Sequence, residues 1–183
     1  MPAPMEIHRM EPFDQRMLEA IYVASEFIDP LNDIVARIQG RPEGPISRPF
    51  IVLRHGEPVS FFTIETASPH IDGSDGRAGV YWLESFFITR DFVGKGHGKA
   101  VVSLLLEMLP VFFPDASALK LTVNARNRIA RKLYRRCGFV DTGEMTFQGP
   151  AGPQHVYEAV DKRRLGPRCC VAQLTLDFPA SEG

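Results

Sequence analysis

Three glycines occupy alternate positions between a hydrophobic segment and an amphipathic one: Gly94, Gly96 and Gly98. The preceding segment, residues 81–88, is dense enough in aromatic and aliphatic side chains for a strand buried on both faces. After the glycines, apolar residues recur at helical spacing over residues 100–108, and Pro110 is expected to close that helix. The pattern predicts a strand, a tight turn and a helix, in that order.

This order of elements suits an anionic ligand. Glycine allows a positive φ and places no Cβ between the backbone and a ligand. The first amides of a helix point toward one spot, where the helix dipole favours negative charge, and Lys95 and Lys99 add positive charge. A phosphate or pyrophosphate is therefore one candidate, and a tight connection without a ligand is the other. The spacing fits neither a P-loop nor a dinucleotide-binding fingerprint.

The segment VGKGHGKA, in this strand-to-helix setting, resembles the acetyl-CoA pyrophosphate loop of the GNAT acetyltransferases. The family pattern is Arg/Gln-x-x-Gly-x-Gly/Ala, and here Val93 takes the first place, with Gly96 and Gly98 in the others. The resemblance implies that acetyl-CoA contacts the strand edge and the glycine turn. The residues implied are Phe86, Phe87, Ile88, Val93, Gly94, Lys95, Gly96, His97, Gly98 and Lys99.

A second block similar to the same family follows a predicted strand at residues 119–124. Residues 127–139 match all five places of the pattern Asn-x-x-Ala-x-x-x-Tyr-x-x-x-Gly-Phe. Asn127, Ala130 and Tyr134 are three and four residues apart and so share a helix face. The resemblance implies that all three bind the cofactor, whereas a helix N-cap for Asn127 and a core position for Tyr134 are the alternatives. With two motifs in the right order, the chain is identified as a member of the GNAT family.

Glu84 is unusual because it lies inside the buried strand pattern WLESFFI. A buried carboxylate is costly unless it is paired or functional. One interpretation is a salt bridge to an arginine on a neighbouring strand or helix. The other comes from the similarity of this segment to Tyr-Leu-Glu-Asp-Phe-Phe-Val of the spermidine/spermine (diamine) acetyltransferases, whose glutamate is the proposed general base. The resemblance then implies that Glu84 deprotonates the acceptor, the Ile88 amide polarises the thioester carbonyl, and Tyr134 protonates the departing sulfur.

The implied function is transfer of the acetyl group of acetyl-CoA to a primary amine, by direct attack in a ternary complex and without a metal. A small cationic amine, such as a polyamine or a lysine-like amino acid, is the expected acceptor. Acids near the first two predicted helices support this as a group: Glu19, Glu26, Asp29 and Asp33. The alternatives are a protein N-terminus, a lysine or an aminoglycoside as acceptor, and a module that binds acyl-CoA without turnover.

The 183 residues suit one domain, expected to span residues 1–160. We expect an α/β fold with a mixed, mostly antiparallel sheet of about seven strands, helices on both faces, and a splay where the strand of Glu84 parts from residues 119–124. Residues 161–183 form an extension whose alternation from Arg168 predicts an added edge strand or pairing across a homodimer.

Composition narrows the class of partner. The net charge of −1 gives no general attraction for nucleic acid or an anionic membrane. No apolar run is long enough to span a bilayer, and residues 1–12 lack the apolar core of a secretory signal. The three cysteines are interpreted as reduced thiols, so a cytoplasmic protein with a small-molecule partner is expected: Cys137, Cys169 and Cys170.

The other elements are predicted from periodicity and turn residues. They are a strand at 6–9, helices at 12–24 and 30–40, a hairpin of 50–54 with 59–66, and strands at 140–147 and 155–160. The polar segment 68–78 is expected to be a mobile loop. His70 within it is interpreted as a solvent-exposed residue rather than a ligand or a catalytic base.

Overall fold

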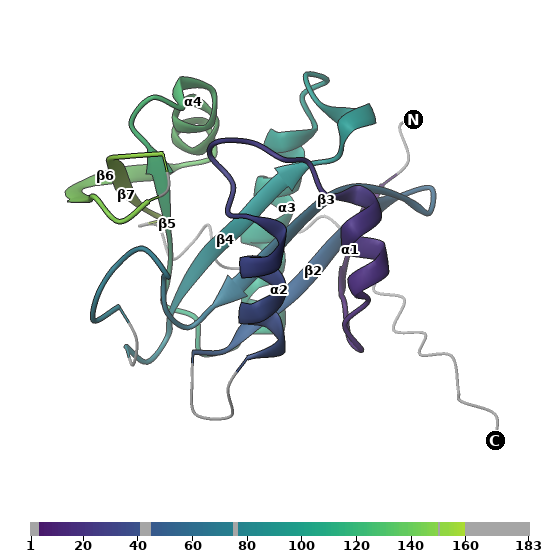
Figure 1. Cartoon of the computed structure of the whole chain (residues 1–183), viewed down its shortest axis with the longest axis horizontal. Helices are drawn as coiled ribbons and strands as arrows, with labels where there is room; N and C mark the ends of the chain where they lie inside the picture. Colours follow the sequence, from purple (N-terminus) through teal and green to yellow (C-terminus); the bar gives the residue numbers. More distant parts are fainter. Residues whose placement is uncertain (1–3, 41–44, 75–76, 150, 160–183) are drawn as a thin grey trace.

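The computed structural model describes residues 4–40, 45–74, 77–149 and 151–159. Within these ranges four α-helices and one seven-stranded sheet are formed (Figure 1). The strands are β1 (Met5–Arg9), β2 (Ser47–Arg54), β3 (Glu57–Glu65), β4 (Val80–Ile88), β5 (Ala118–Asn124), β6 (Phe139–Thr146) and β7 (Gln154–Ala159). The helices are α1 (Gln15–Ile21), α2 (Leu31–Gln39), α3 (His97–Phe112) and α4 (Arg128–Arg136), with a short 3₁₀ turn, η1 (Arg90–Phe92).

The strand order is β1-β2-β3-β4-β5-β7-β6. The first four strands are neighbours in chain order and pair antiparallel. The last three also pair antiparallel, so among the described strands only β4 and β5 run parallel. The prediction of a mixed, mostly antiparallel sheet is confirmed.

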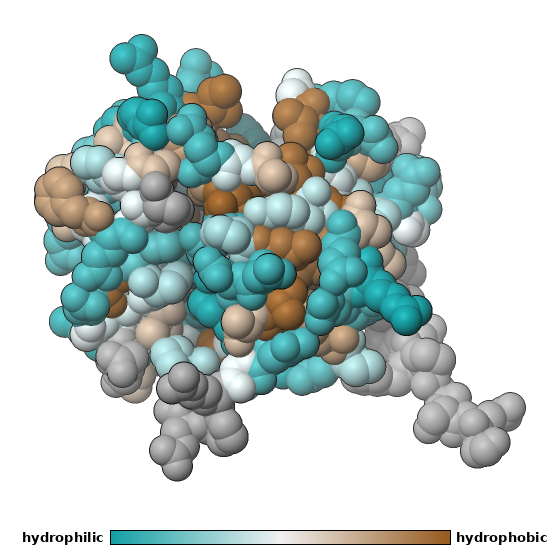
Figure 2. All heavy atoms as spheres, in the orientation of Figure 1, coloured by the Kyte–Doolittle hydropathy of each residue, from teal (hydrophilic) through white to brown (hydrophobic). Residues whose placement is uncertain are grey.

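Helices cover both faces of the sheet, as predicted. In Figure 1, α1 and α2 lie in front of the sheet and α3 lies behind it. On the α1–α2 face, Leu18 and Ile34 pack with Phe61 and Phe87, and apolar side chains show as a brown band through the middle of this face (Figure 2). The larger core lies on the α3–α4 face and takes up the apolar stripe of α3: Val101, Val102, Leu105, Leu106 and Leu109.

β4 leaves its neighbour partway along its length. It pairs with β5 only where Val80–Trp82 faces Ala118–Lys120. Further on, β4 carries a bulge against β3, because Phe87 faces Phe61 and Glu84 faces Thr63, which leaves two residues opposite one. Ser85, in this bulge, has a φ of 54°, which a non-glycine residue rarely adopts. A bulge bends its strand, and the C-terminal ends of β4 and β5 therefore diverge.

Two predicted element boundaries beside prolines are wrong: the helix end at Pro110 and the strand start at residue 50. Pro110 does not close α3, which continues to Phe112, and the amide of Phe113 still donates to the Leu109 carbonyl at 2.8 Å. Near a helix end a proline removes only its own donor, and the packed apolar stripe holds the last turn. Pro49 lies inside β2, beyond the residue at which pairing with β1 ends, so its missing N–H leaves the sheet intact.

The predicted C-terminal strand, residues 161–183, lies outside the described residues. In the part of the chain that the structure does describe, no helix is long and apolar enough to cross a membrane.

Candidate active site

The diverging ends of β4 and β5 enclose a cavity of about 310 Å³. Its walls come from β4, β5, α4 and the segment between α1 and α2, which arches over the end of β4 toward α4 in Figure 1. The predicted site residues that line it are Glu84, Phe86, Phe87, Ile88, Val93, Asn127, Ala130 and Tyr134. The structure therefore brings the central strand, Val93 and three residues of the second motif to one cleft. The other predicted cofactor contacts in the glycine turn do not line it: Gly94, Lys95, Gly96, His97, Gly98 and Lys99.

The glycine turn lies between β4 and α3 in the chain, directly after η1. Gly94 and Gly96 have φ values of 76° and 81°, and a Cβ on either would meet nothing within 4 Å. Gly96 is the N-cap of α3 and offers no side chain to the first-turn amides. These amides are therefore open to an outside acceptor, and a phosphate group is the kind of ligand that fits them.

Gly98 has a different reason to be a glycine. A Cβ there would lie 3.3 Å from Cδ2 of Leu133, on α4. The residue therefore allows α3 and α4 to pack closely, although sequence reasoning grouped it with the ligand-contacting glycines. The remaining turn side chains are partly engaged: Lys95 Nζ donates to the Asp91 carbonyl at 2.7 Å, and His97 packs edge-on against Phe92.

The two α4 residues with competing interpretations serve structural roles and also face the cavity. Asn127 is the N-cap of α4 and accepts from the Ala130 amide at 3.0 Å. Tyr134 is buried, with its ring against Phe86 and Phe139. Burial, followed by the charge of Glu84, raises the pKa of Tyr134 above its ordinary value. Its hydroxyl therefore keeps its proton at neutral pH and has one to donate.

Glu84 is buried, at 5% exposure, and its Oε1 accepts a hydrogen bond of 2.7 Å from the Ser68 hydroxyl. Burial and the charge of Glu65 raise the pKa of Glu84 to about 8, against opposing effects of His70, Ser68 and Arg37. The predicted arginine salt bridge is not found: among the described residues Glu84 has no ion pair. A carboxyl that titrates near neutral pH in a cleft is suited to accept a proton from a substrate.

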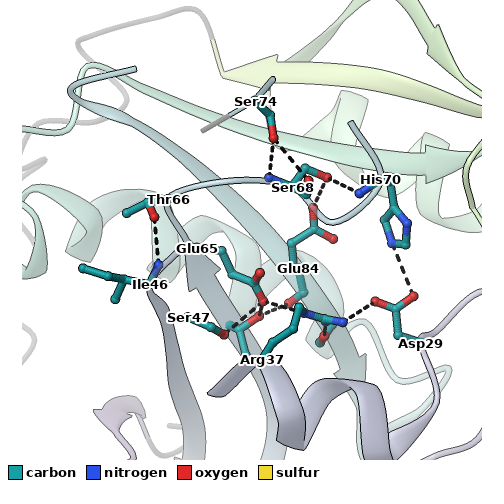
Figure 3. Close-up of polar contacts among 12 residues, drawn as sticks. Asp29, Arg37, Ile46, Ser47, Glu65, Thr66, Ser68, His70, Ser74 and Glu84 are labelled. Carbon is teal, nitrogen blue, oxygen red and sulfur yellow. Dashed lines mark hydrogen bonds and ion pairs between the residues drawn. The ribbon is translucent and has the colours of Figure 1, made fainter. Parts of the chain in front are cut away.

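Four charged side chains surround Glu84, and we call them the charged frame: Asp29, Arg37, Glu65 and His70 (Figure 3). Arg37, from α2, lies between two carboxylates, 3.0 Å from Asp29 Oδ2 and 3.2 Å from Glu65 Oε1. It also donates to the Ser85 hydroxyl at 2.7 Å. The side chain of Arg37 thus ties α2 to the bulge that turns β4 away from β5.

The interpretation of His70 as a solvent-exposed loop residue is wrong. Its side chain is only 12% exposed, and its Nε2 lies 3.3 Å from Asp29 Oδ1. The loop is held by a bond within it, in which the Ser68 amide donates to the Ser74 hydroxyl, and by a bond from β6, in which the Thr146 hydroxyl donates to the His70 carbonyl. No local pattern distinguishes such a histidine, because its partners come from other elements.

Of the four acids expected near the acceptor, two reach the cavity. Glu26 and Asp29 line it, whereas Glu19 and Asp33 are solvent-exposed on α1 and α2. Glu26 pairs with Arg126 at 3.0 Å, which joins the arching segment to the loop before α4. Arg126 also donates to the Ala151 carbonyl at 3.0 Å. Arg126 thus contacts two residues that line the cavity, Glu26 and Ala151.

A mixed sheet that opens into a cleft beside a glycine turn is the arrangement to compare with known protein families. The model of the acetyltransferase (GNAT) family matches residues 8–139. The protein belongs to this family.

Similar proteins of known sequence come from Bacillus subtilis strain 168. The uncharacterized N-acetyltransferase YbbJ is 30% identical over 106 residues, covering 58% of this chain and 66% of YbbJ. A spermine/spermidine N(1)-acetyltransferase is 35% identical over 75 residues, covering 41% of this chain and 49% of the relative. The chain thus matches about half to two thirds of the length of these relatives.

Solved structures share the fold at low identity. Aminoglycoside acetyltransferase AAC(6')-Ib in complex with coenzyme A superposes with a TM-score of 0.67 at 20% identity, covering 85% of this chain and 94% of that one. Spermidine N-acetyltransferase from Vibrio cholerae with CoA and spermine gives a TM-score of 0.64 at 15% identity, covering 88% and 98%. At these identities the likeness concerns the fold.

Proposed function

We propose that this protein is an acetyl-CoA-dependent N-acetyltransferase that acts on a small cationic primary amine. The observation that carries the proposal is the position of Glu84, a buried carboxyl with a pKa of about 8, on the wall of a cleft that is also lined by Val93, in the turn before α3. Family membership and the named activities of the relatives support the same reaction.

The cofactor end is provided mainly by backbone. First-turn amides of α3 and the left-handed glycines before it would hold the pyrophosphate of acetyl-CoA. Residues 86–88 of β4 have no β5 partner, so their edge amides and carbonyls are open to an extended ligand. A ligand that runs along this edge from the glycine turn leads its thioester toward Glu84.

The acceptor end must supply a free amine. An amine of pKa about 10 is mostly protonated at neutral pH, and exposing its free base costs about 4 kcal/mol. Glu84 takes this proton, and the freed nitrogen then bonds to the acetyl carbon. As the bond from that carbon to sulfur breaks, the nitrogen loses a second proton, which balances the proton gained by the sulfur. The Ile88 amide polarises the carbonyl, and the Tyr134 hydroxyl gives a proton to the sulfur. A base with a pKa of about 8 is better matched to an ammonium than an ordinary carboxylate is.

A cationic acceptor fits the charges around the cavity. Glu26 and Glu84 both face it, and the named relative acts on spermine and spermidine. Aminoglycosides are also polycationic amines, and the AAC(6')-Ib likeness keeps them as a second candidate class. A protein N-terminus or lysine, and a module that binds acyl-CoA without turnover, are the other outcomes that a test must separate.

The test is a coenzyme A thiol-release assay with acetyl-CoA and a panel of acceptors. The panel contains a polyamine, free lysine, an aminoglycoside, a peptide with a free N-terminus and a neutral amine, with a reaction lacking acceptor as control. Release that is stimulated most by the small cationic amines supports the proposal. Preference for a neutral acceptor contradicts the acceptor class, and calorimetric acetyl-CoA binding without release from any amine indicates the non-catalytic module.

A further inference from the structure

On the basis of this N-acetyltransferase function, we propose that His70 is a positioning residue for Glu84. Its imidazolium, held by Asp29, balances the charged frame and so keeps the Glu84 carboxylate available to take the acceptor's proton. No motif in the sequence points to this histidine, and its role follows from where the fold places it.

The geometry fixes His70 from several sides. Its ring nitrogen Nε2 is 3.3 Å from Asp29 Oδ1, and both side chains are largely buried. Its amide donates at 3.3 Å to the Ser68 hydroxyl, which itself donates to Glu84 Oε1 at 2.7 Å. The Thr146 hydroxyl, from β6, donates to the His70 carbonyl. The ring thereby lines the same cavity as Glu84 (Figure 3).

The charges that face Glu84 come from every element packed around it. Arg37 comes from α2, Glu65 from β3, and Asp29 and His70 from the two flanking loops, while α4 contributes the neutral hydroxyl of Tyr134. Arg37 is one cation between two carboxylates. Without His70 these fixed groups therefore sum to one negative charge, and with a protonated imidazole they sum to zero.

The charge on His70 therefore sets the net charge of the groups beside the Glu84 carboxyl. A neutral imidazole would leave a net negative frame beside a buried carboxyl, and like charges oppose ionisation. Burial works against protonation of His70, but the hydrogen bond with Asp29 and the charges of Glu84 and Asp29 outweigh it and raise the pKa of His70. In turn, the charge of His70 lowers the pKa of Glu84. The two groups titrate as a coupled pair.

A purely structural role is the competing explanation, in which His70 only attaches its loop to the segment between α1 and α2 through Asp29. The two roles predict different measurements. If His70 has only a structural role, its loss lowers stability and reduces turnover by the same factor at every pH. If its charge acts on Glu84, its loss changes the pH at which Glu84 ionises. His70→Gln separates them because glutamine retains a donor toward Asp29 but carries no charge.

The decisive experiment is a ¹³C NMR titration of the Glu84 carboxyl carbon, assigned by its disappearance in Glu84→Gln. In His70→Gln the midpoint is expected to rise by about one pH unit, the lower end of the effect of a neighbouring charge. His70→Lys keeps the positive charge and is expected not to raise it. His8→Gln, in an exposed histidine on β1 that pairs with Glu6, is the matched control and should leave it unchanged.

The pH profile of thiol release gives a second measurement. Its ascending limb should move to higher pH in His70→Gln, so that turnover at neutral pH falls about tenfold and recovers in alkali. An unshifted Glu84 midpoint in folded His70→Gln overturns the inference. If that variant does not fold, the wild-type curve decides, because coupling requires a second inflection at the titration of His70. A shifted midpoint without acetylation of any amine leaves the inference standing and refutes the proposed function.

Discussion

The two ends of the cleft are built in opposite ways. At the proposed cofactor end, one short segment, residues 93–99, supplies a turn with left-handed glycines and the first amides of α3. At the proposed acceptor end, the groups around Glu84 come from distant parts of the chain: Asp29, Arg37, Glu65 and His70. The first end depends on backbone conformation, and the second depends on side-chain charge.

This difference determines how each end responds to change. A binding site made of backbone amides loses its ligand when one side chain blocks it, while the residues around that side chain keep their conformation. A buried charge cluster is coupled, so that replacing one member alters the ionisation of the others. Substitutions at the cofactor end should therefore change binding, whereas those at the acceptor end should change turnover and its pH dependence.

Glu84→Gln is expected to have the largest effect. The amide cannot accept the proton, so turnover at neutral pH should fall about a hundredfold or more, the usual size of a general-base contribution. Acetyl-CoA affinity, measured by calorimetry, should stay nearly unchanged. The wild-type kcat/KM should rise with pH toward about 8, where Glu84 becomes ionised. Wild-type turnover in the variant at neutral pH would refute the role of Glu84.

Thermal stability provides the control for this variant. The pKa of Glu84 is raised from 4.5 to about 8, so the fold prefers the protonated carboxyl. Wild-type stability from this group is present below pH 4.5 and is lost progressively as pH rises to about 8. Relative to wild type, Glu84→Gln should therefore gain stability over that interval. A variant that is less stable than wild type at pH 8 would contradict the raised pKa of Glu84, and one without a cooperative unfolding transition would owe its inactivity to misfolding.

Gly96→Val tests the backbone end. A branched side chain at a φ of 81° both strains the turn and occupies the approach to the α3 amides, so the acetyl-CoA Kd should rise about tenfold or more. Gly56→Val is the matched control, since Gly56 has a φ of 77°, meets no atom within 4 Å, and lies in the β2–β3 turn. Both variants should lose similar stability, and only Gly96→Val should lose affinity. Unchanged calorimetric binding would overturn the cofactor assignment.

Tyr134→Phe removes one hydroxyl and keeps the ring between Phe86 and Phe139. If Tyr134 protonates the sulfur, turnover should fall about tenfold, less than for Glu84 because a thiolate leaves more readily than an amine loses its proton. Acetyl-CoA affinity and thermal stability should be nearly unaffected. Turnover equal to wild type across the pH range would leave packing as the whole role of this tyrosine.

Arg126→Ala should have the smallest effect, because its pair with Glu26 is exposed. Loss of the cation leaves Glu26 unpaired on the cavity wall, where it can attract a cationic amine. The KM for such an amine should therefore fall about twofold at low salt and equal the wild-type value at high salt. Arg9→Ala, at the end of β1, breaks an exposed pair with Glu11 and removes the same charge away from the cleft. An equal change in both variants would assign the effect to net charge alone.

Most of the fold could be predicted because its signals are local. The β2–β3 hairpin, for example, is predicted from turn residues between two apolar runs, and His55 and Gly56 in that turn both adopt a positive φ. Its boundary was less accurate, since Pro58 belongs to β3 and was assigned to the turn. The wrong helix end at Pro110 has the same origin: packing of the α3 stripe, a tertiary effect, outweighed a local stop signal.

In the candidate site too, local features could be predicted and tertiary contacts could not. The glycine turn and Asn127, Ala130 and Tyr134 were singled out by their resemblance to two family patterns, which could be recognised because each set lies in one segment. Glu84 stood out because it interrupts a buried strand. The ion pairs of Arg37 and His70 could not be found, since Asp29 and Glu65 become their neighbours only when α2, β3 and two loops pack together.

The short pairing between β4 and β5 also bears on how the chain folds. Strands β1 to β4 join in sequence order, and β5 to β7 form their own antiparallel group, so each half assembles mainly from contacts between nearby segments. The sheet joins these halves only where Val80–Trp82 meets Ala118–Lys120. A molecule that binds in the cleft touches both halves. Its binding free energy therefore adds to the free energy of unfolding of the two halves together.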